Sequence, residues 1–331
     1  MKRRAPRWAI EGVAWCASLV LIAAVAVVVS GVIDTKITSS QVLADTPVLK
    51  APVLTATVPP KPVVRVPGKA PTVVSHARTG VPIETSLGPP PGPQDDAVPT
   101  AFAAPADRYA FLFGVTRYRK PTHDTIAGAN DVVFIRSSLL AAGWLPQNIR
   151  MVTNEDATGV ALRDGIGWLA NKSKPGTFTL FHYSGHVKQE GGHEKLWPYD
   201  HDLLPDTDLA GVLNQGTGRM WVDIAGCEAA GFIENLPSDR VLVSTSSLAS
   251  QKSYEYPQWG ESVWTGLVWD LGLGQGQADT NRNGTTTVGE ALRYGAYYAQ
   301  AITLHQTPHG RQSPQVAGDP VRGWTLANPP A

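Results

Sequence analysis

The chain has 331 residues, and its 28 lysine and arginine residues balance its 28 aspartate and glutamate residues. This balance excludes the strong positive field with which nucleic-acid-binding proteins attract phosphate, so we expect no nucleic-acid partner. Only two cysteines are present, and Cys16 lies in an apolar segment near the N-terminus, so Cys227 has no disulfide partner in the folded part. A leftover thiol of this kind is a candidate reactive group.

The first 33 residues predict a membrane anchor. A basic segment, residues 1–11, precedes an uncharged apolar stretch at 12–33, which is long enough to cross a hydrocarbon core about 30 Å thick as a helix. Because basic residues stay on the cytoplasmic side, the N-terminus of this single-pass protein is predicted to be cytoplasmic and the remainder extracytoplasmic. The alternative is cleavage after Ser30, which would give a secreted protein.

Residues 34–106 are predicted to form an extended tether. The stretch 44–105 holds 14 of the chain's 27 prolines and shows neither strand nor helix periodicity. Such a segment cannot build a core and favours polyproline II. We interpret it as a spacer, with a cut that releases the folded domain as the alternative.

From residue 107 to about 325 the sequence alternates strands with helices. An uninterrupted apolar run predicts a buried strand at 109–115, and strand-like runs predict further strands at 148–154, 177–183, 219–226 and 240–246. Helical spacing, with Thr158 as a cap and Gly143 as a stop, predicts helices at 127–143, 160–171, from Asp206 or Thr207, at 261–272 and at 289–302. This alternation predicts a mostly parallel sheet covered by helices on both faces.

A histidine and the single thiol follow two of these predicted strands. His186 comes shortly after the strand at 177–183, and Cys227 directly after the strand at 219–226. Open α/β sheets place their chemistry at the carboxyl ends of strands, so the two side chains are expected to meet. A histidine beside a thiolate can activate it and protonate the leaving group, which predicts a cysteine hydrolase. The alternative is a buried structural cysteine.

His182 lies four residues before His186, a spacing that on a helix would suggest zinc. On a strand the two residues would lie about 13 Å apart, too far for one ion with ligand bonds of about 2 Å. We therefore exclude zinc and interpret His182 as a core residue.

Several short motifs, in this order, resemble the caspase, metacaspase and paracaspase peptidases. They are GVTRY (114–118), GAND (128–131), HYSGH (182–186), LWPYD (196–200), the cysteine after a strand, VSTSSLASQKSYE (243–255) and GESVWTGLVWDL (260–271). The segment CEAAGFIENLP (227–237) is also similar to legumain-type enzymes. The resemblance covers about residues 108–310 and implies an α/β fold, a caspase-like three-layer sandwich with a mostly parallel central sheet flanked by helices.

The resemblance also implies a function, that of a cysteine endopeptidase acting on protein or peptide substrates through a thioester, without an organic cofactor. Cys227 would be the nucleophile and His186 the general acid and base, while the backbone N–H groups of Val187 and Cys227 would form the oxyanion hole. The family has glycine after the histidine. Here Val187 must therefore avoid a positive φ, which valine adopts only with strain.

Substrate recognition is implied for Asp131, because the matching residue of metacaspases lines an acidic pocket for a basic P1 side chain. Their second pocket aspartate is replaced here by Ala225, so we expect a weaker preference for Arg or Lys. The alternative is that Asp131 only complements the dipole at a helix start.

Four departures from the family pattern keep a second hypothesis open, namely an inactive caspase-like domain that acts as a tethered binding or scaffold module. They are Val187, Ala225, Ala229 and Ala230. A third hypothesis is a calcium-stabilised envelope-binding protein in which Cys227 is only part of the core.

The segment DTNRNGTTTVGE (279–290) fits the EF-hand loop pattern D-x-[DN]-x-[DN]-G-x₅-E. The predicted calcium ligands are Asp279, Asn281, Asn283, the Thr285 carbonyl and Glu290. The glycine-rich stretch 272–277 gives no clear entering helix. Because only two ligands carry charge, we expect a Kd on the order of 10⁻⁴–10⁻³ M. The alternative is an Asx-rich turn without metal.

Overall fold

The computed structural model of the protein describes residues 104–236, 239–306, 309–318 and 325–326. The predicted anchor and nearly all of the predicted tether lie outside these residues. Within the described part of the chain, no helix is long and apolar enough to span a membrane.

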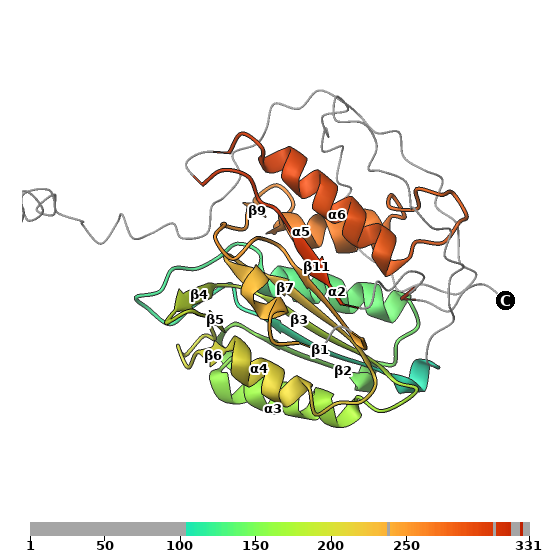
Figure 1. The fold of residues 1–331 in the computed structure, drawn as a ribbon, viewed down its shortest axis with the longest axis horizontal. Helices are drawn as coiled ribbons and strands as arrows, with labels where there is room; N and C mark the ends of the chain where they lie inside the picture. The colour runs from blue at the N-terminus through green and yellow to red at the C-terminus, as the bar shows by residue number, and fades with distance from the viewer. Residues whose placement is uncertain (1–103, 237–238, 307–308, 319–324, 327–331) are drawn as a thin grey trace, which may run out of the picture. The chain divides into compact units, whose positions relative to one another are not determined.

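A six-stranded sheet lies at the centre of the fold, with strand order β11-β8-β7-β3-β1-β2 (Figure 1). The strands are β1 (Arg108–Gly114), β2 (Ile149–Thr153), β3 (Phe178–Ser184), β7 (Arg219–Ala225), β8 (Val241–Thr245) and β11 (Gln315–Ala317). The first five of these run parallel, and β11 pairs with β8 in the antiparallel sense. The predicted mostly parallel sheet is therefore confirmed, with an antiparallel edge strand that was not expected.

Helices cover both faces of this sheet (Figure 1). One face carries α2 (Gly128–Ala141), α5 (Val263–Thr265), the π-helix η6 (Gly266–Gly274) and α6 (Val288–Thr303), and the other carries α3 (Gly159–Lys172) and α4 (Asp206–Leu213). The alternation of β1 explains the two cores, since Ala110 and Leu112 pack on the α2 side while Phe111 and Phe113 pack on the α3 side. The predicted three-layer sandwich is confirmed.

Shorter elements complete the described part. They are the 3₁₀ turns η2 (Pro105–Asp107), η3 (Pro146–Asn148), η4 (Asn154–Asp156) and η5 (Ala229–Ile233), and the strands β4 (Val187–Glu190), β5 (His193–Leu196), β6 (Leu204–Pro205), β9 (Glu255–Tyr256) and β10 (Glu261–Ser262). β4, β5 and β6 form a small sheet directly after His186, and β9 pairs with β10. The sequence predicted neither of these sheets.

A buried carboxylate on β7 ties α5 and η6 to the central sheet. Asp223 is fully buried and accepts hydrogen bonds from the indole N–H groups of Trp264 at 2.7 Å and Trp269 at 2.9 Å. It also contacts His182 Nδ1 at 2.8 Å and accepts from the Ser244 hydroxyl at 2.5 Å. Burial raises the pKa of Asp223, but these hydrogen bonds and the His182 ring outweigh it and hold the pKa below its usual value.

Candidate active site

The ends of β3 and β7 bring the predicted histidine and cysteine segments together. Ser184 and Ala225 are Cα partners in the sheet, and His186 and Cys227 each follow two residues later. The Gly185 amide donates to the Ala225 carbonyl at 3.2 Å, which extends the pairing beyond the strands. At Gly226 an added Cβ would lie only 2.6 Å from Val187 Cγ2, so glycine allows the two segments to pack closely.

The imidazole of His186 is held on several sides. Its Nε2 lies 2.9 Å from the His123 carbonyl oxygen, which can only accept, so this nitrogen carries the proton and Nδ1 is left as the basic nitrogen. The Tyr118 ring packs against it with 4.6 Å between ring centroids, and the Tyr118 hydroxyl accepts from the His186 backbone N–H at 2.7 Å. With 8 % of its surface exposed, the histidine is fixed in orientation and tautomer.

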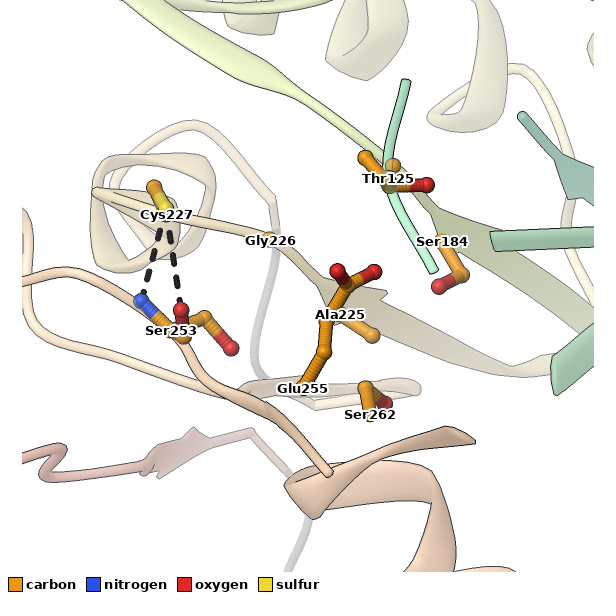
Figure 2. Close-up of a pocket in the computed structure, with 9 residues that line it drawn as sticks. Thr125, Ser184, Ala225, Gly226, Cys227, Ser253, Glu255 and Ser262 are labelled. Carbon is orange, nitrogen blue, oxygen red and sulfur yellow. Dashed lines mark hydrogen bonds between the residues drawn. The ribbon is translucent and has the colours of Figure 1, made fainter. Parts of the chain in front are cut away.

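The thiol of Cys227 lies in a different setting. Figure 2 shows it turned toward the backbone of Ser253, whose N–H donates to Sγ at 3.4 Å and whose carbonyl oxygen lies 3.9 Å away. Only 5 % of the residue is exposed. Burial raises the pKa of the thiol to about 11, so in this arrangement the sulfur is protonated at neutral pH.

Two peptide planes beside these side chains are fixed by hydrogen bonds to their carbonyl oxygens. The His186 carbonyl accepts from the Trp197 N–H at 3.2 Å and from the Tyr183 hydroxyl at 2.5 Å. The Gly226 carbonyl accepts from the hydroxyls of Ser246 at 2.8 Å and Ser247 at 3.0 Å.

The predicted oxyanion-hole donors belong to these same two peptides. In a trans peptide the N–H and C=O groups point in opposite directions, so the N–H groups of Val187 and Cys227 face away from the fixed carbonyl partners. Among the described residues, positive φ outside glycine occurs only at Asn154, His201, Glu228 and Arg282. The φ of Val187 is therefore not positive. Its backbone lacks the strain that valine would have in a conformation open only to glycine.

A small pocket lies beside Cys227 (Figure 2). Its lining includes Thr125, Ser184, Ala225, Ser253, Glu255 and Ser262. Glu255 is the one carboxylate among the described residues that line it. Its two oxygens accept from the backbone N–H groups of Ile126 and Ala127, both at 2.8 Å, at the start of α2. Burial raises the pKa of Glu255 to about 7.

Asp131, the predicted pocket residue, lies behind the residues that line the pocket. It is fully buried and accepts from the Ser184 hydroxyl at 2.6 Å and the Ser262 N–H at 3.0 Å. Both partners line the pocket, whereas Asp131 is not among its lining residues. Burial raises the pKa of Asp131. Its carboxylate thus positions two pocket residues, and the acid that lines the pocket is Glu255.

The predicted calcium ligands lie in the connection between η6 and α6, except Glu290, which lies in the first turn of α6. The Asn283 N–H donates to Asp279 Oδ1 at 3.1 Å and to Asn281 Oδ1 at 2.9 Å, and the Thr285 N–H donates to Asn283 Oδ1 at 2.9 Å. Glu290 closes a capping box with Thr287 at the start of α6. In the described part of the chain, no three His, Cys, Asp or Glu side chains gather as a metal site.

Sequence reasoning did not identify the partners that orient the site. Glu255 stands at the end of the motif 243–255, and Tyr118 at the end of 114–118, but neither motif gives the direction of these side chains. The His123 carbonyl carries no side-chain signal at all. These roles depend on contacts between segments far apart in the sequence.

Comparison with known proteins identifies the family to which this part of the chain is similar. Residues 107–223 match the caspase domain of the C14 peptidases. The resemblance to caspase-type peptidases is thereby confirmed, and it supports a cysteine peptidase at the level of the family. The matched region includes His186 and Asp131 and ends at Asp223, before Cys227.

One solved structure that the comparison matches is the crystal structure of protein GSU0716 from Geobacter sulfurreducens. It is 15 % identical in sequence, covers 67 % of this chain and 99 % of its own chain, and has a TM-score of 0.48. No curated protein matches the chain.

Proposed function

We propose that this protein is a membrane-anchored, extracytoplasmic cysteine endopeptidase that uses Cys227 and His186. The observation that carries the proposal is the pairing of Ser184 with Ala225, because it brings the two segments that follow into contact. The caspase-domain match supports the class of reaction, and the apolar stretch 12–33 supports the anchor.

In the proposed reaction, Nδ1 of His186 accepts the thiol proton as the sulfur of Cys227 attacks the peptide carbonyl carbon. The protonated imidazole then donates that proton to the leaving amine as the C–N bond breaks, which leaves a thioester on Cys227. A water molecule, deprotonated by His186, hydrolyses the thioester and restores the thiol. The His123 carbonyl supports this cycle because it fixes the proton on Nε2 and leaves Nδ1 as the base.

The carbonyl oxygen becomes negatively charged in both tetrahedral intermediates. The N–H groups of Val187 and Cys227 are the proposed donors to this oxygen, and such preorganised donors commonly contribute a factor of about 10²–10³ each to kcat. The hydroxyls of Ser246 and Ser247 support the role of Cys227, since they hold the carbonyl of the same peptide on the opposite side.

The thiol must lose its proton before it can react as a nucleophile. With a pKa of about 11 it is neutral at physiological pH, and only the thiolate is a strong nucleophile. We infer that the neutral thiol is a resting state, and that a substrate in the pocket promotes transfer of its proton to His186. Calcium dependence of the activity is part of this proposal and is tested with it.

For substrate recognition we propose that Glu255 gives the pocket its preference. Its carboxylate lines the pocket and favours a P1 side chain that is cationic or donates hydrogen bonds. Asp131 contributes through Ser184 and Ser262, which it holds in the pocket wall. With Glu255 as the one acid among the described residues that line the pocket, we expect a modest preference for Arg or Lys.

One observation favours the second candidate function, an inactive domain that acts as a tethered binding module. It is the buried, neutral thiol, since a cysteine with a pKa of about 11 resembles a structural core residue more than an activated nucleophile.

The test is peptide cleavage by the full-length chain in detergent, with a P1-diverse peptide pool, with and without calcium. We expect cleavage by the wild type and by Cys16→Ala, and no cleavage by Cys227→Ala. The two cysteine variants are a matched pair, because each removes one of the chain's two thiols. A folded wild type that cleaves nothing under either condition contradicts the proposal and favours the binding module.

A further inference from the structure

The helix η6, the calcium-type loop and α6 together form a helix–loop–helix unit. η6 ends at Gly274 and α6 begins at Val288. The two helices pack closely, since a Cβ added at Gly295 of α6 would lie 2.3 Å from Val268 Cγ2 of η6. The glycine-rich sequence at 272–277 obscured the entering helix, which the π-helix supplies. The loop therefore connects two helices that are fixed against each other.

The loop brings its oxygen atoms together on one side. Asp279 Oδ1 and Asn281 Oδ1 accept from the same N–H group, that of Asn283, so these two oxygens are close neighbours. Asp279 Oδ2 accepts from the Gly284 N–H at 3.1 Å. Arg282 and Gly284 both have positive φ, of 60° and 86°, and these two turns curl the chain around the Asp279 carboxylate.

The carboxylate of Glu290 indicates that a ligand is missing from this arrangement. Only 3 % of Glu290 is exposed, and its Oε2 accepts from the Thr287 N–H at 2.9 Å and hydroxyl at 3.0 Å, which turns the group back from α6 onto the loop. Its Oε1 is buried and has no hydrogen-bond partner. A carboxylate oxygen buried without a partner is costly, and a cation would remove that cost.

We propose that residues 279–290 bind one Ca²⁺ ion. Calcium fits this donor set because it takes six to eight oxygen ligands in flexible geometry, including amide and backbone carbonyl oxygens and a bidentate carboxylate. Mg²⁺ demands a smaller, near-octahedral shell and fits it less well. The proposed ligands are Asp279, Asn281, Asn283, the Thr285 carbonyl and Glu290. The proposal stands on the loop alone and does not require peptidase activity.

The charge of the loop sets the expected strength of binding. Asp279 and Glu290 supply two negative charges, and the guanidinium of Arg282 in the same loop opposes them. Sites with so few charged ligands bind in the range of about 10⁻⁴–10⁻³ M, which suits extracellular calcium. At about 10 mM calcium such a site is almost full, and the ion stabilises the folded state because the unfolded chain offers no such cage.

The experiment is a calcium titration of the full-length chain by calorimetry, with thermal unfolding in Ca²⁺ and in Mg²⁺ alongside. We expect one site, and a midpoint of unfolding that rises in Ca²⁺ more than in Mg²⁺. Glu290→Gln keeps an acceptor for the capping box but loses the charge, and is expected to weaken binding at least tenfold. Asn283→Ala removes an exposed ligand without disturbing the core, and is expected to weaken binding by a smaller factor.

Asp164→Asn is the control for the loss of one negative charge. Asp164 is an exposed residue of α3 that pairs with Arg150. This variant should bind calcium as the wild type does. The proposal is overturned if the folded wild type shows no saturable binding by about 10 mM calcium. Unchanged binding by both Glu290→Gln and Asn283→Ala would also overturn it, because the ion would then lie elsewhere.

Discussion

The segments after β3 and β7 carry the two proposed catalytic side chains, and they hold them in different ways. The imidazole of His186 is fixed by the His123 carbonyl and the Tyr118 ring, with its tautomer already suited to a base. The thiol of Cys227 lies on the backbone of Ser253, where burial keeps it neutral. For the proposed dyad, the difference indicates that the base is preorganised and that activity depends on deprotonation of the thiol.

Among the changes that test this comparison, removal of the base should lower kcat the most. His186→Ala is expected to lower kcat by a factor of about 10²–10⁴, the usual contribution of general acid–base catalysis. The measurement is steady-state cleavage of the best peptide found, with His305→Ala, a histidine outside the site, as the matched control. Equal loss in both variants would mean that the effect comes from stability and not from the chemistry.

The neutral thiol makes a prediction about labelling, to be measured in the Cys16→Ala background. With a pKa of about 11, Cys227 should react with iodoacetamide at pH 8 roughly a hundredfold more slowly than a free cysteine of pKa about 8.5. A peptidyl acyloxymethyl ketone, which occupies the pocket as a substrate does, should label Cys227 rapidly in the wild type and slowly in His186→Ala.

Iodoacetamide and the peptidyl ketone together distinguish an active dyad from an inactive domain. Slow labelling by both, independent of His186, would identify an inactive domain. Rapid iodoacetamide labelling that depends on His186 would mean that the imidazole already activates the thiol without substrate, and the neutral resting thiol would then be wrong.

The peptide plane before Cys227 offers a sharper test of the oxyanion hole. Replacing both Ser246 and Ser247 by alanine removes the donors that hold the Gly226 carbonyl, so the Cys227 N–H loses its fixed direction. We expect kcat to fall about tenfold with KM little changed, because the interaction forms only in the transition state. Ser138→Ala, which removes a hydroxyl that donates to the Phe134 carbonyl within α2, is the control. A change confined to KM would contradict the assignment.

The carboxylate of Glu255 should make both stability and selectivity depend on pH. Its pKa of about 7 exceeds the ordinary 4.5, so the folded state binds this proton more tightly than the unfolded chain does. The resulting stability, about 3 kcal/mol at most, is fully present below pH 4.5 and is lost as the pH rises to about 7. Glu255→Gln should flatten this slope, as measured by denaturant unfolding between pH 4 and about 8.

Selectivity should follow the same ionisation. The ratio of kcat/KM for a P1 arginine peptide to that for its uncharged citrulline analogue should rise about tenfold through pH 7 in the wild type and stay flat in Glu255→Gln. Because the ratio cancels the titration of the catalytic groups, a rise that persists in the variant would exclude Glu255 as its cause.

The sequence was a good guide wherever one segment contains its own signal. The strand predicted at 177–183 is β3 at 178–184, the helix predicted at 127–143 is α2 at 128–141, and Thr158 caps α3 as expected, accepting from the Ala161 N–H at 3.2 Å. Apolar runs and cap residues are local features, so they determine local structure with little help from the rest of the chain.

Features that arise between distant segments were not predictable in this way. β9 and β10 are two residues each and exist only because they pair with each other. Glu255 lines the pocket because amides 128 and more residues away bind its oxygens. For the same reason Asp131 lies behind the pocket lining, since it binds Ser184 of β3 and Ser262 of β10.

The hydrogen bonds of Asp223 have a mechanical consequence. This residue lies on the strand that leads to Cys227, and the two indoles that it binds lie on α5 and η6, the helical segment that leads into the 279–290 loop. Displacing that segment from the strand would leave a buried carboxylate without two of its donors. The strand and the helical segment should therefore move as one body. A displacement of the 279–290 loop should then also displace the turn that carries Cys227.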